Sequence, residues 1–172
     1  MVLPPQHAAT ISRVSAPLLY EEPLRAAIIA FKFADRTDLA PLFARLMAGH
    51  LAASAQAVLV PVPSHPKRLR ERCYNPAALI AHELAQLTGL KADLTSLTRV
   101  RYEAPQQTLS RAARLKLTRT HFACGPALFG KDVVLIDDIY TTGATVAACA
   151  GALRHAGAAQ VQVVTLAYTK PG

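Results

Sequence analysis

Apolar residues recur at near-helical spacing in several parts of the chain. Pro23 stands at the permitted first turn of one such segment. Asn75-Pro76 combines a favoured N-cap with proline at the first helical position, and Gly89 suits the end of the helix that begins there. Gly157 similarly closes the last helical segment. The pattern therefore predicts helices over residues 24–33, 39–53, 76–88 and 142–155.

Short apolar runs lie between these helices and predict strands over residues 57–62, 94–100, 132–136 and 161–168. The runs are nearly continuous rather than alternating, which is typical of strands buried in a parallel sheet. Strands that alternate with helices indicate a mostly parallel, doubly wound α/β sheet. We expect one domain over residues 1–172, with a helical N-terminal hood region (1–56) and a sheet core (57–172). Residues 1–15 are predicted to form an irregular arm.

The most informative motif follows the 132–136 run. Asp137-Asp138 ends the predicted strand, and Thr141-Thr142-Gly143-Ala144-Thr145 leads into a helix. Small hydroxyl residues and a glycine at a helix N-terminus allow backbone N–H groups to surround an anion. Two carboxylates beside that turn can accept hydrogen bonds from a vicinal diol. The combination predicts a receptor for a ribose 5-phosphate.

Each half of this motif also has a simpler interpretation. An Asp-Asp strand end also occurs in magnesium sites of nucleotide hydrolases, and a Thr-Thr-Gly turn can be only a helix cap. The chain has neither Gly-x-x-x-x-Gly-Lys-Ser/Thr nor Gly-x-Gly-x-x-Gly, so a P-loop and a dinucleotide fingerprint are absent.

The motif resembles the phosphoribosyl-pyrophosphate (PRPP) binding motif of type I phosphoribosyltransferases. Along most of the chain the sequence is similar to the ComF family, which is phosphoribosyltransferase-like and linked to DNA uptake in natural competence. The matching pieces besides the acidic motif are Pro23-Leu24-Arg25, Phe31-Lys32-Phe33, Val60-Pro61-Val62-Pro63 with His65-Pro66 and Arg68, Tyr74-Asn75, and Pro105-Gln106-Gln107 with Ser110-Arg111.

The resemblance implies a type I phosphoribosyltransferase fold and a PRPP site with Mg²⁺. Asp137 and Asp138 would hold the ribose hydroxyls, bind Mg²⁺ through water and stabilise positive charge on the ribose ring. The 5-phosphate would lie on Thr141, Thr142, Gly143, Ala144 and Thr145.

The family's diphosphate loop matches a basic segment that is predicted to be a loop, residues 64–73. Its candidate residues are Ser64, His65, Lys67 and Arg68. Residues 101–119 match the family's flexible catalytic loop, with Arg111, Arg114 and Lys116 as candidates to cover the leaving group; Arg114 and Lys116 are the catalytic candidates there. Lys32 is expected on the acceptor side. Tyr140 either lines the acceptor pocket or packs in the core.

Charge and cysteine content narrow the chemistry further. A net charge of +8 favours an anionic partner, whether a polyphosphate or a nucleic acid. The three scattered cysteines lack metal-ligand spacing, so no zinc is expected, although ComF proteins commonly carry a zinc ribbon that this lineage lost or this sequence omits. No secretory signal or membrane-spanning run is evident, and a cytoplasmic location is expected.

The sequence thus predicts an enzyme that transfers a 5-phosphoribosyl group from PRPP to an unidentified nitrogen acceptor and releases pyrophosphate. The alternative is a non-catalytic module that senses PRPP or a nucleotide, or helps to handle single-stranded DNA during competence. Possible partners are PRPP and its acceptor, weakly bound single-stranded DNA, a competence protein or a second copy of the chain. Neither the acceptor nor the oligomeric state follows from the sequence.

Overall fold

A central parallel sheet organises the molecule. A computed structural model describes residues 9–100 and 121–170. The sheet order is β1-β8-β7-β3-β4, with β2 also paired to β8, and every pairing is parallel. This confirms the predicted α/β class. Its strands are β1 (Arg13–Ser15), β2 (Leu18–Leu19), β3 (Val58–Pro61), β4 (Lys91–Ala92), β7 (Asp132–Tyr140) and β8 (Gln160–Tyr168).

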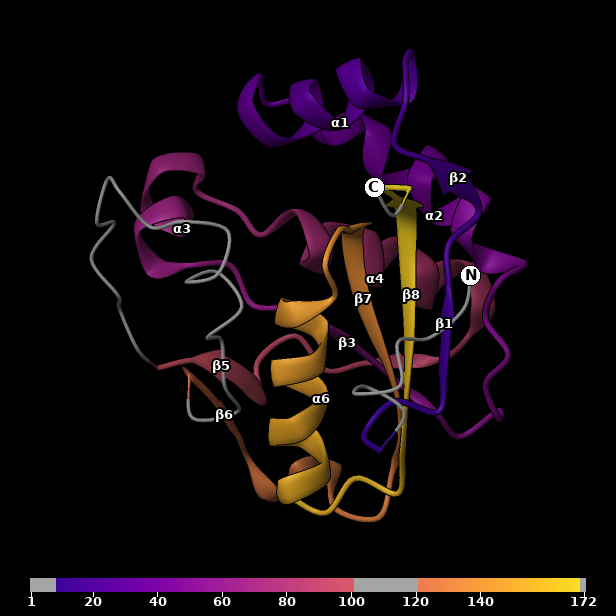
Figure 1. The fold of residues 1–172 in the computed structure, drawn as a ribbon, viewed down its shortest axis with the longest axis vertical. Coiled ribbons are helices and arrows are strands. Elements are labelled where there is room, and N and C mark those ends of the chain that lie inside the picture. The colour runs from indigo at the N-terminus through magenta and orange to yellow at the C-terminus, as the bar shows by residue number, and fades with distance from the viewer. Residues whose placement is uncertain (1–8, 101–120, 171–172) are drawn as a thin grey trace.

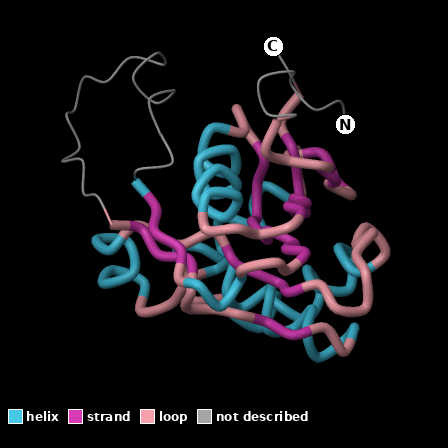
Figure 2. Tube along the Cα trace, turned by 90° about the horizontal axis from the view of Figure 1, so that it is seen from below, coloured by secondary structure: helices cyan, strands magenta, loops and turns pink. Residues whose placement is uncertain are grey.

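Helices cover both faces of this sheet (Figures 1 and 2). The helices are α1 (Leu24–Phe33), α2 (Ala40–Ala48), α3 (Pro66–Arg72), α4 (Pro76–Thr88) and α6 (Ala144–His155), with 3₁₀ turns η2 (Thr37–Leu39) and η4 (Pro126–Leu128). One core cluster joins α6 to the sheet through Val146, Cys149 and Leu135. The other joins α1, α2 and α4 to the opposite face. No helix within the described ranges is long and apolar enough to cross a membrane.

Several helix ends lie where the sequence predicts them. The Asn75 side chain accepts a hydrogen bond from the Ala77 backbone N–H at 3.2 Å and caps α4, with Pro76 at its first position. Gly89 ends α4 in the left-handed conformation at φ 73°. The α1 boundaries equal the predicted range, whereas α2 ends at Ala48, before the predicted residue 53.

Four further local predictions were wrong. The basic segment 64–73 contains helix α3 rather than only a loop, because the His65 ring nitrogen caps it and Pro66 fits its first turn. The motif strand continues to Tyr140 instead of ending at residue 136, since its pairing with β8 extends to that residue. Residues 13–15, predicted to be irregular, add strand β1 to the sheet edge. The 94–100 strand is shortened to β5 (Leu97–Arg99), which pairs antiparallel with β6 (Phe122–Cys124) outside the main sheet.

The N-terminal region is consequently not a purely helical hood. Its strands β1 and β2 belong to the sheet, and its helix α2 packs against α4 on one face of the sheet. Helix α1 lies above the carboxyl ends of β7 and β8 (Figure 1). It is this helix that reaches the candidate site described below.

Replacing Cys73 by glycine should stabilise the fold. Cys73 follows α3 in the left-handed conformation at φ 63°, where a Cβ atom is disfavoured by about 1–2 kcal/mol. We expect Cys73→Gly to raise the free energy of unfolding by about 1 kcal/mol, measured by urea denaturation. Cys73→Ala is the matched control, because it removes the thiol but keeps the Cβ atom. Equal stability of the two variants would contradict this account.

Candidate functional site

A cluster of polar side chains lies at the carboxyl edge of the sheet. Strands β3 and β7 are neighbours and run parallel, so the segments that follow them meet at one edge. A cavity of about 750 Å³ opens there. Its lining comes from the end of α1, the segment after β3, α3, β5, the end of β7 and the start of α6: Lys32, Val62, Pro63, Ser64, His65, Lys67, Arg68, Glu71, Arg72, Asn75, Pro76, Ala77, Arg99, Asp137, Asp138, Ile139, Thr141 and Thr145.

The two motif acids face opposite sides of β7. Successive side chains of a strand alternate between faces. Ile136 packs with the α1, α2 and α4 helices, and Asp138 continues that face. Its carboxylate lies 2.7 Å from the Lys32 ammonium, and its side chain is only 9% exposed. Leu135 packs toward α6, and Asp137 continues toward that side.

Asp137 and Asp138 differ in their electrostatic environment. Burial, followed by repulsion from Asp138, raises the pKa of Asp137 to about 8, while Lys32 and a hydrogen bond oppose the rise. That bond is donated by the Asp138 backbone N–H to Asp137 Oδ1 at 2.9 Å. Asp137 also affects the α6 side of the strand. Burial is the main cause that raises the pKa of the Cys149 thiol on α6, and the charge of Asp137 is the next. Burial and the neighbouring acid therefore both favour the protonated form of Asp137.

The turn after β7 has the geometry expected of an anion cradle. Gly143 stands at the N-cap of α6 with φ 76°, a conformation that side chains with a Cβ atom rarely adopt. The Ala144 N–H contacts Thr142 Oγ1 at 3.4 Å, and Thr141 and Thr145 line the cavity. The first backbone N–H groups of α6 thus lie beside the cavity, together with the positive end of the helix dipole.

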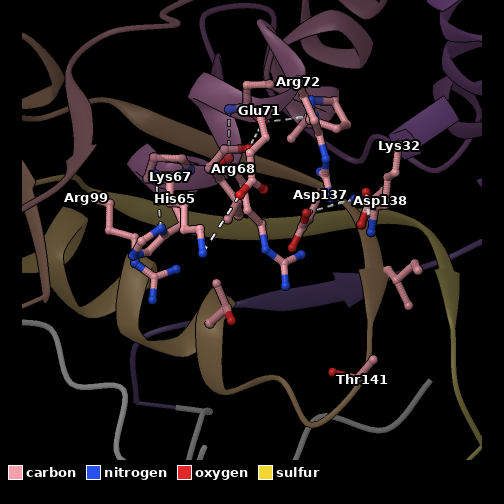
Figure 3. Close-up of a pocket in the computed structure, with 18 residues that line it drawn as sticks. Lys32, His65, Lys67, Arg68, Glu71, Arg72, Arg99, Asp137, Asp138 and Thr141 are labelled. Atoms are coloured by element: carbon pink, nitrogen blue, oxygen red, sulfur yellow. Dashed lines mark hydrogen bonds and ion pairs between the residues drawn. The ribbon is translucent and has the colours of Figure 1, made fainter. Parts of the chain in front are cut away.

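The opposite wall of the cavity is basic. The His65 ring caps α3, and burial, followed by the charges of Arg99 and Arg68, lowers its pKa. Lys67 lies 3.9 Å from Glu71 (Figure 3). The neighbouring Asn75 fixes the segment after β3, since it donates to the Val62 carbonyl at 3.0 Å and accepts from the Ser64 hydroxyl at 2.9 Å.

The structure brings most of the predicted residues together. Ser64, His65, Lys67 and Arg68 share the cavity with both acids, Thr141 and Thr145. Lys32 also lines it, in contact with Asp138. Tyr140 takes the second of its two predicted places: it is only 5% exposed, packs in the core on the α6 side and is not part of the cavity lining, which corrects its acceptor-side assignment. Arg111, Arg114 and Lys116 lie outside the described residues.

Sequence reasoning missed three polar residues of the cavity, Glu71, Arg72 and Arg99. Arg72 stacks on the Phe33 ring, with 4.3 Å between the guanidinium carbon and the ring centroid. The helical spacing of Arg68 and Arg72 places them on one face of α3, a signal that the loop interpretation concealed. Arg99 is contributed by β5, which lies outside the main sheet.

Similarity to known proteins agrees with this architecture. Residues 69–172 match the family model described as the phosphoribosyl transferase domain. The chain belongs to this family. The DNA utilization protein YhgH of Salmonella typhi is 32% identical over 157 residues, covering 87% of this chain and 69% of that protein. Competence protein ComFC of Streptococcus pneumoniae is 27% identical over 147 residues, covering 86% of this chain and 64% of that protein. These relatives confirm the ComF resemblance.

A solved structure described as the allosteric regulatory enzyme of purine biosynthesis matches with a TM-score of 0.50 and 24% identity. The match covers 74% of this chain and 25% of that one. It supports the fold of the phosphoribosyl transferase domain and nothing finer.

Removing the Asp137 carboxyl should change how stability depends on pH. Because the pKa of Asp137 rises from about 3.9 in unfolded chains to about 8 in the folded protein, the folded state binds the extra proton between these values, and stability falls as pH rises through them. Asp137→Asn removes this loss and keeps an oxygen for the Asp138 N–H. Its stability relative to wild type should therefore increase between pH 4 and pH 8, by about 1.4 kcal/mol for each unit by which the pKa is raised.

Thermal unfolding of both proteins in metal-free buffer at several pH values measures this difference. A stability difference that stays constant from pH 4 to pH 8.5 would contradict the environment described for Asp137.

Proposed function

We propose that this protein binds PRPP with Mg²⁺ and transfers the 5-phosphoribosyl group to a nitrogen acceptor, releasing pyrophosphate. One observation carries the proposal: a single cavity combines the acid pair and the Gly143 turn with a facing basic wall on α3. These groups complement a molecule with a phosphate at one end, a diol in the middle and a diphosphate at the other end.

The 5-phosphate would bind at the start of α6. Its oxygens would accept hydrogen bonds from backbone N–H groups of residues 141–145 and from the Thr141 and Thr145 hydroxyls. Gly143 permits this approach because the turn needs its positive φ. Membership of the phosphoribosyl transferase domain family supports this placement.

The ribose and the metal would share the acid pair. Asp137 and Asp138 suit a diol and a Mg²⁺ ion held through water, since Mg²⁺ favours substrate phosphates with few protein carboxylates. In the described part of the chain, no group of three or more His, Cys, Asp or Glu side chains is placed to bind a metal by itself. Bound Mg²⁺ would neutralise charge on the departing diphosphate.

The diphosphate would lie against the basic wall, on Ser64, His65, Lys67 and Arg68. Arg111, Arg114 and Lys116 are proposed to cover it from the 101–120 segment. The acceptor nitrogen would form a bond to the anomeric carbon with its lone pair while the bond from that carbon to the diphosphate oxygen breaks. Pyrophosphate leaves with the bonding electrons, and any acceptor N–H proton passes to water. Asp137 and Asp138 would stabilise the positive charge that develops on the ribose ring.

Binding of MgPRPP should depend on the acid pair. Calorimetric titration of the wild-type protein should show binding that needs both Mg²⁺ and PRPP. Asp137→Asn/Asp138→Asn should weaken it by about tenfold or more, because hydrogen bonds to charged groups contribute about 1.5–3 kcal/mol each. Pyrophosphate release in the presence of a panel of nitrogen bases then tests turnover. Asp93→Asn, on the segment after edge strand β4 and outside the cavity lining, is the matched control. Unchanged affinity in the double variant would contradict the proposed site.

A non-catalytic role in handling DNA is the second candidate. The relatives named for DNA utilization and competence favour it, as does the net charge of +8. In this role the same basic wall would contact phosphates of a single strand, and the pocket would sense PRPP or a nucleotide.

Salt dependence and competition separate the two roles. If the α3 cations contact a single strand, the logarithm of affinity should fall with that of salt concentration by about 0.7 per phosphate contact. MgPRPP should then displace a labelled oligonucleotide in fluorescence anisotropy, because both ligands need Lys67 and Arg68. The DNA-handling role would be favoured over the transferase if the oligonucleotide bound tightly, independently of salt and of MgPRPP, and if no pyrophosphate were released.

A further inference from the structure

The last turn of α1 forms one wall of the cavity through three consecutive residues. The Phe31 carbonyl accepts a hydrogen bond from the Tyr74 hydroxyl. Lys32 forms the ion pair with Asp138. Phe33 stacks against the Arg72 guanidinium. This turn therefore connects the acid pair on β7 to the end of α3.

The two cations on this wall differ in their partners. Lys32 is neutralised by Asp138 at 2.7 Å. Arg72 has no ion-pair partner within residues 9–100 and 121–170, and its Nη2 nitrogen is shielded from water without a hydrogen-bond acceptor there. Burial, followed by the charge of Arg68, lowers the pKa of Arg72. A guanidinium N–H group in such a place favours any ligand that supplies an oxygen acceptor, above all a charged one.

Phe33 provides an aromatic surface beside this cation. Its side chain is 65% exposed, although one face of the ring covers the guanidinium. An exposed phenylalanine is free to change rotamer and give a ligand access to the shielded nitrogen. Aromatic rings and guanidinium groups both stack on planar heterocycles. The wall thus combines a flat apolar surface with a guanidinium whose Nη2 nitrogen has no hydrogen-bond acceptor among the described residues.

This wall adjoins the proposed diphosphate wall along α3, where Arg68 and Arg72 share a helix face, but the two walls extend to opposite sides of the cavity. His65, Lys67 and Arg99 gather at one side of the cavity, whereas Lys32 and Asp138 lie at the other, with Arg72 above the acids (Figure 3). A group transferred with inversion is attacked from the side opposite its leaving group. The Lys32–Arg72 side is therefore where an acceptor would stand.

We propose that the acceptor is a planar aromatic nitrogen compound that carries an anionic oxygen group, stacked near Phe33 with its oxygen on Arg72. This rests on the proposed transferase function and narrows it to a class of substrate. Lys32 would hold Asp138 in place on the same wall as a positioning residue.

Matched acid and amide probes test the charge requirement. The pairs are nicotinate and nicotinamide, anthranilate and 2-aminobenzamide, and uracil-6-carboxylate and its carboxamide. Binding of each is measured by saturation-transfer NMR with MgPRPP present, and MgPRPP affinity is measured separately by calorimetry. Wild-type protein should bind at least one acid about tenfold or more tightly than its amide.

Substitution of the wall should remove this preference. Arg72→Gln keeps a side-chain hydrogen-bond donor but loses the positive charge. The ratio of the affinity for the acid to the affinity for its amide should therefore fall to near one, while the affinity for MgPRPP stays within about twofold of wild type. Phe33→Leu, at an exposed position that tolerates change, should weaken acid and amide alike. Arg70→Gln is the control, since Arg70 is an exposed residue of the same helix outside the cavity lining.

Each outcome is decisive. If Arg72→Gln lost affinity for MgPRPP but kept the preference for the acid probes, Arg72 would be reassigned to the diphosphate site and the inference would be overturned. Wild-type protein that binds MgPRPP but shows no acid preference would overturn the inference alone. Wild-type protein that fails to bind MgPRPP would overturn the transferase proposal, and this inference with it.

Discussion

The site depends on β7 being hydrogen-bonded on both sides. Its pairing with β3 places the segment after Pro61 beside the acid pair, and its pairing with β8 continues to Tyr140. Pairing with β3 ends at Ile136, and pairing with β8 alone carries the strand past both acids, so the carboxyl groups stand on a strand rather than on a loop. The same pairing brings the Gly143 turn and α3 to one edge of the sheet.

The strand also separates the chemistry of the two acids. Adjacent residues of a strand face opposite sides, so Asp138 meets Lys32 from α1 while Asp137 turns toward the buried side of α6. The Asp138 carboxylate forms an ion pair with Lys32, whereas burial and the charge of Asp138 raise the pKa of Asp137. In a ligand-free cavity these opposite environments avoid placing two unpaired negative charges side by side.

The cavity is closed by residues from both halves of the chain. The α1 turn reaches Asp138, Arg72 and Tyr74, so the N-terminal region completes a site whose motif lies more than a hundred residues later. The wall it forms differs from the α3 wall because it carries the aromatic ring of Phe33. It also holds two cations with different partners: Lys32 is paired with Asp138, whereas the Arg72 Nη2 nitrogen has no hydrogen-bond acceptor among the described residues. Membership of the phosphoribosyl transferase domain family accounts for the sheet and the acid motif. The aromatic ring and the guanidinium of this wall are the reason for proposing a planar, anionic acceptor.

The sequence by itself determined the elements whose signals are local. Periodicity located α1, Asn75-Pro76 and Gly89 bounded α4, and the order of acids, threonines and glycine indicated the anion cradle. Tertiary structure decided what depends on distant partners: the extension of β7, the edge strand β1, the burial of Tyr140 and the pairing of Lys32 with Asp138. It also revealed Arg72 and Arg99 in the cavity. Strand limits and side-chain partners follow from hydrogen bonds and packing between segments far apart in the chain, and no local pattern encodes them.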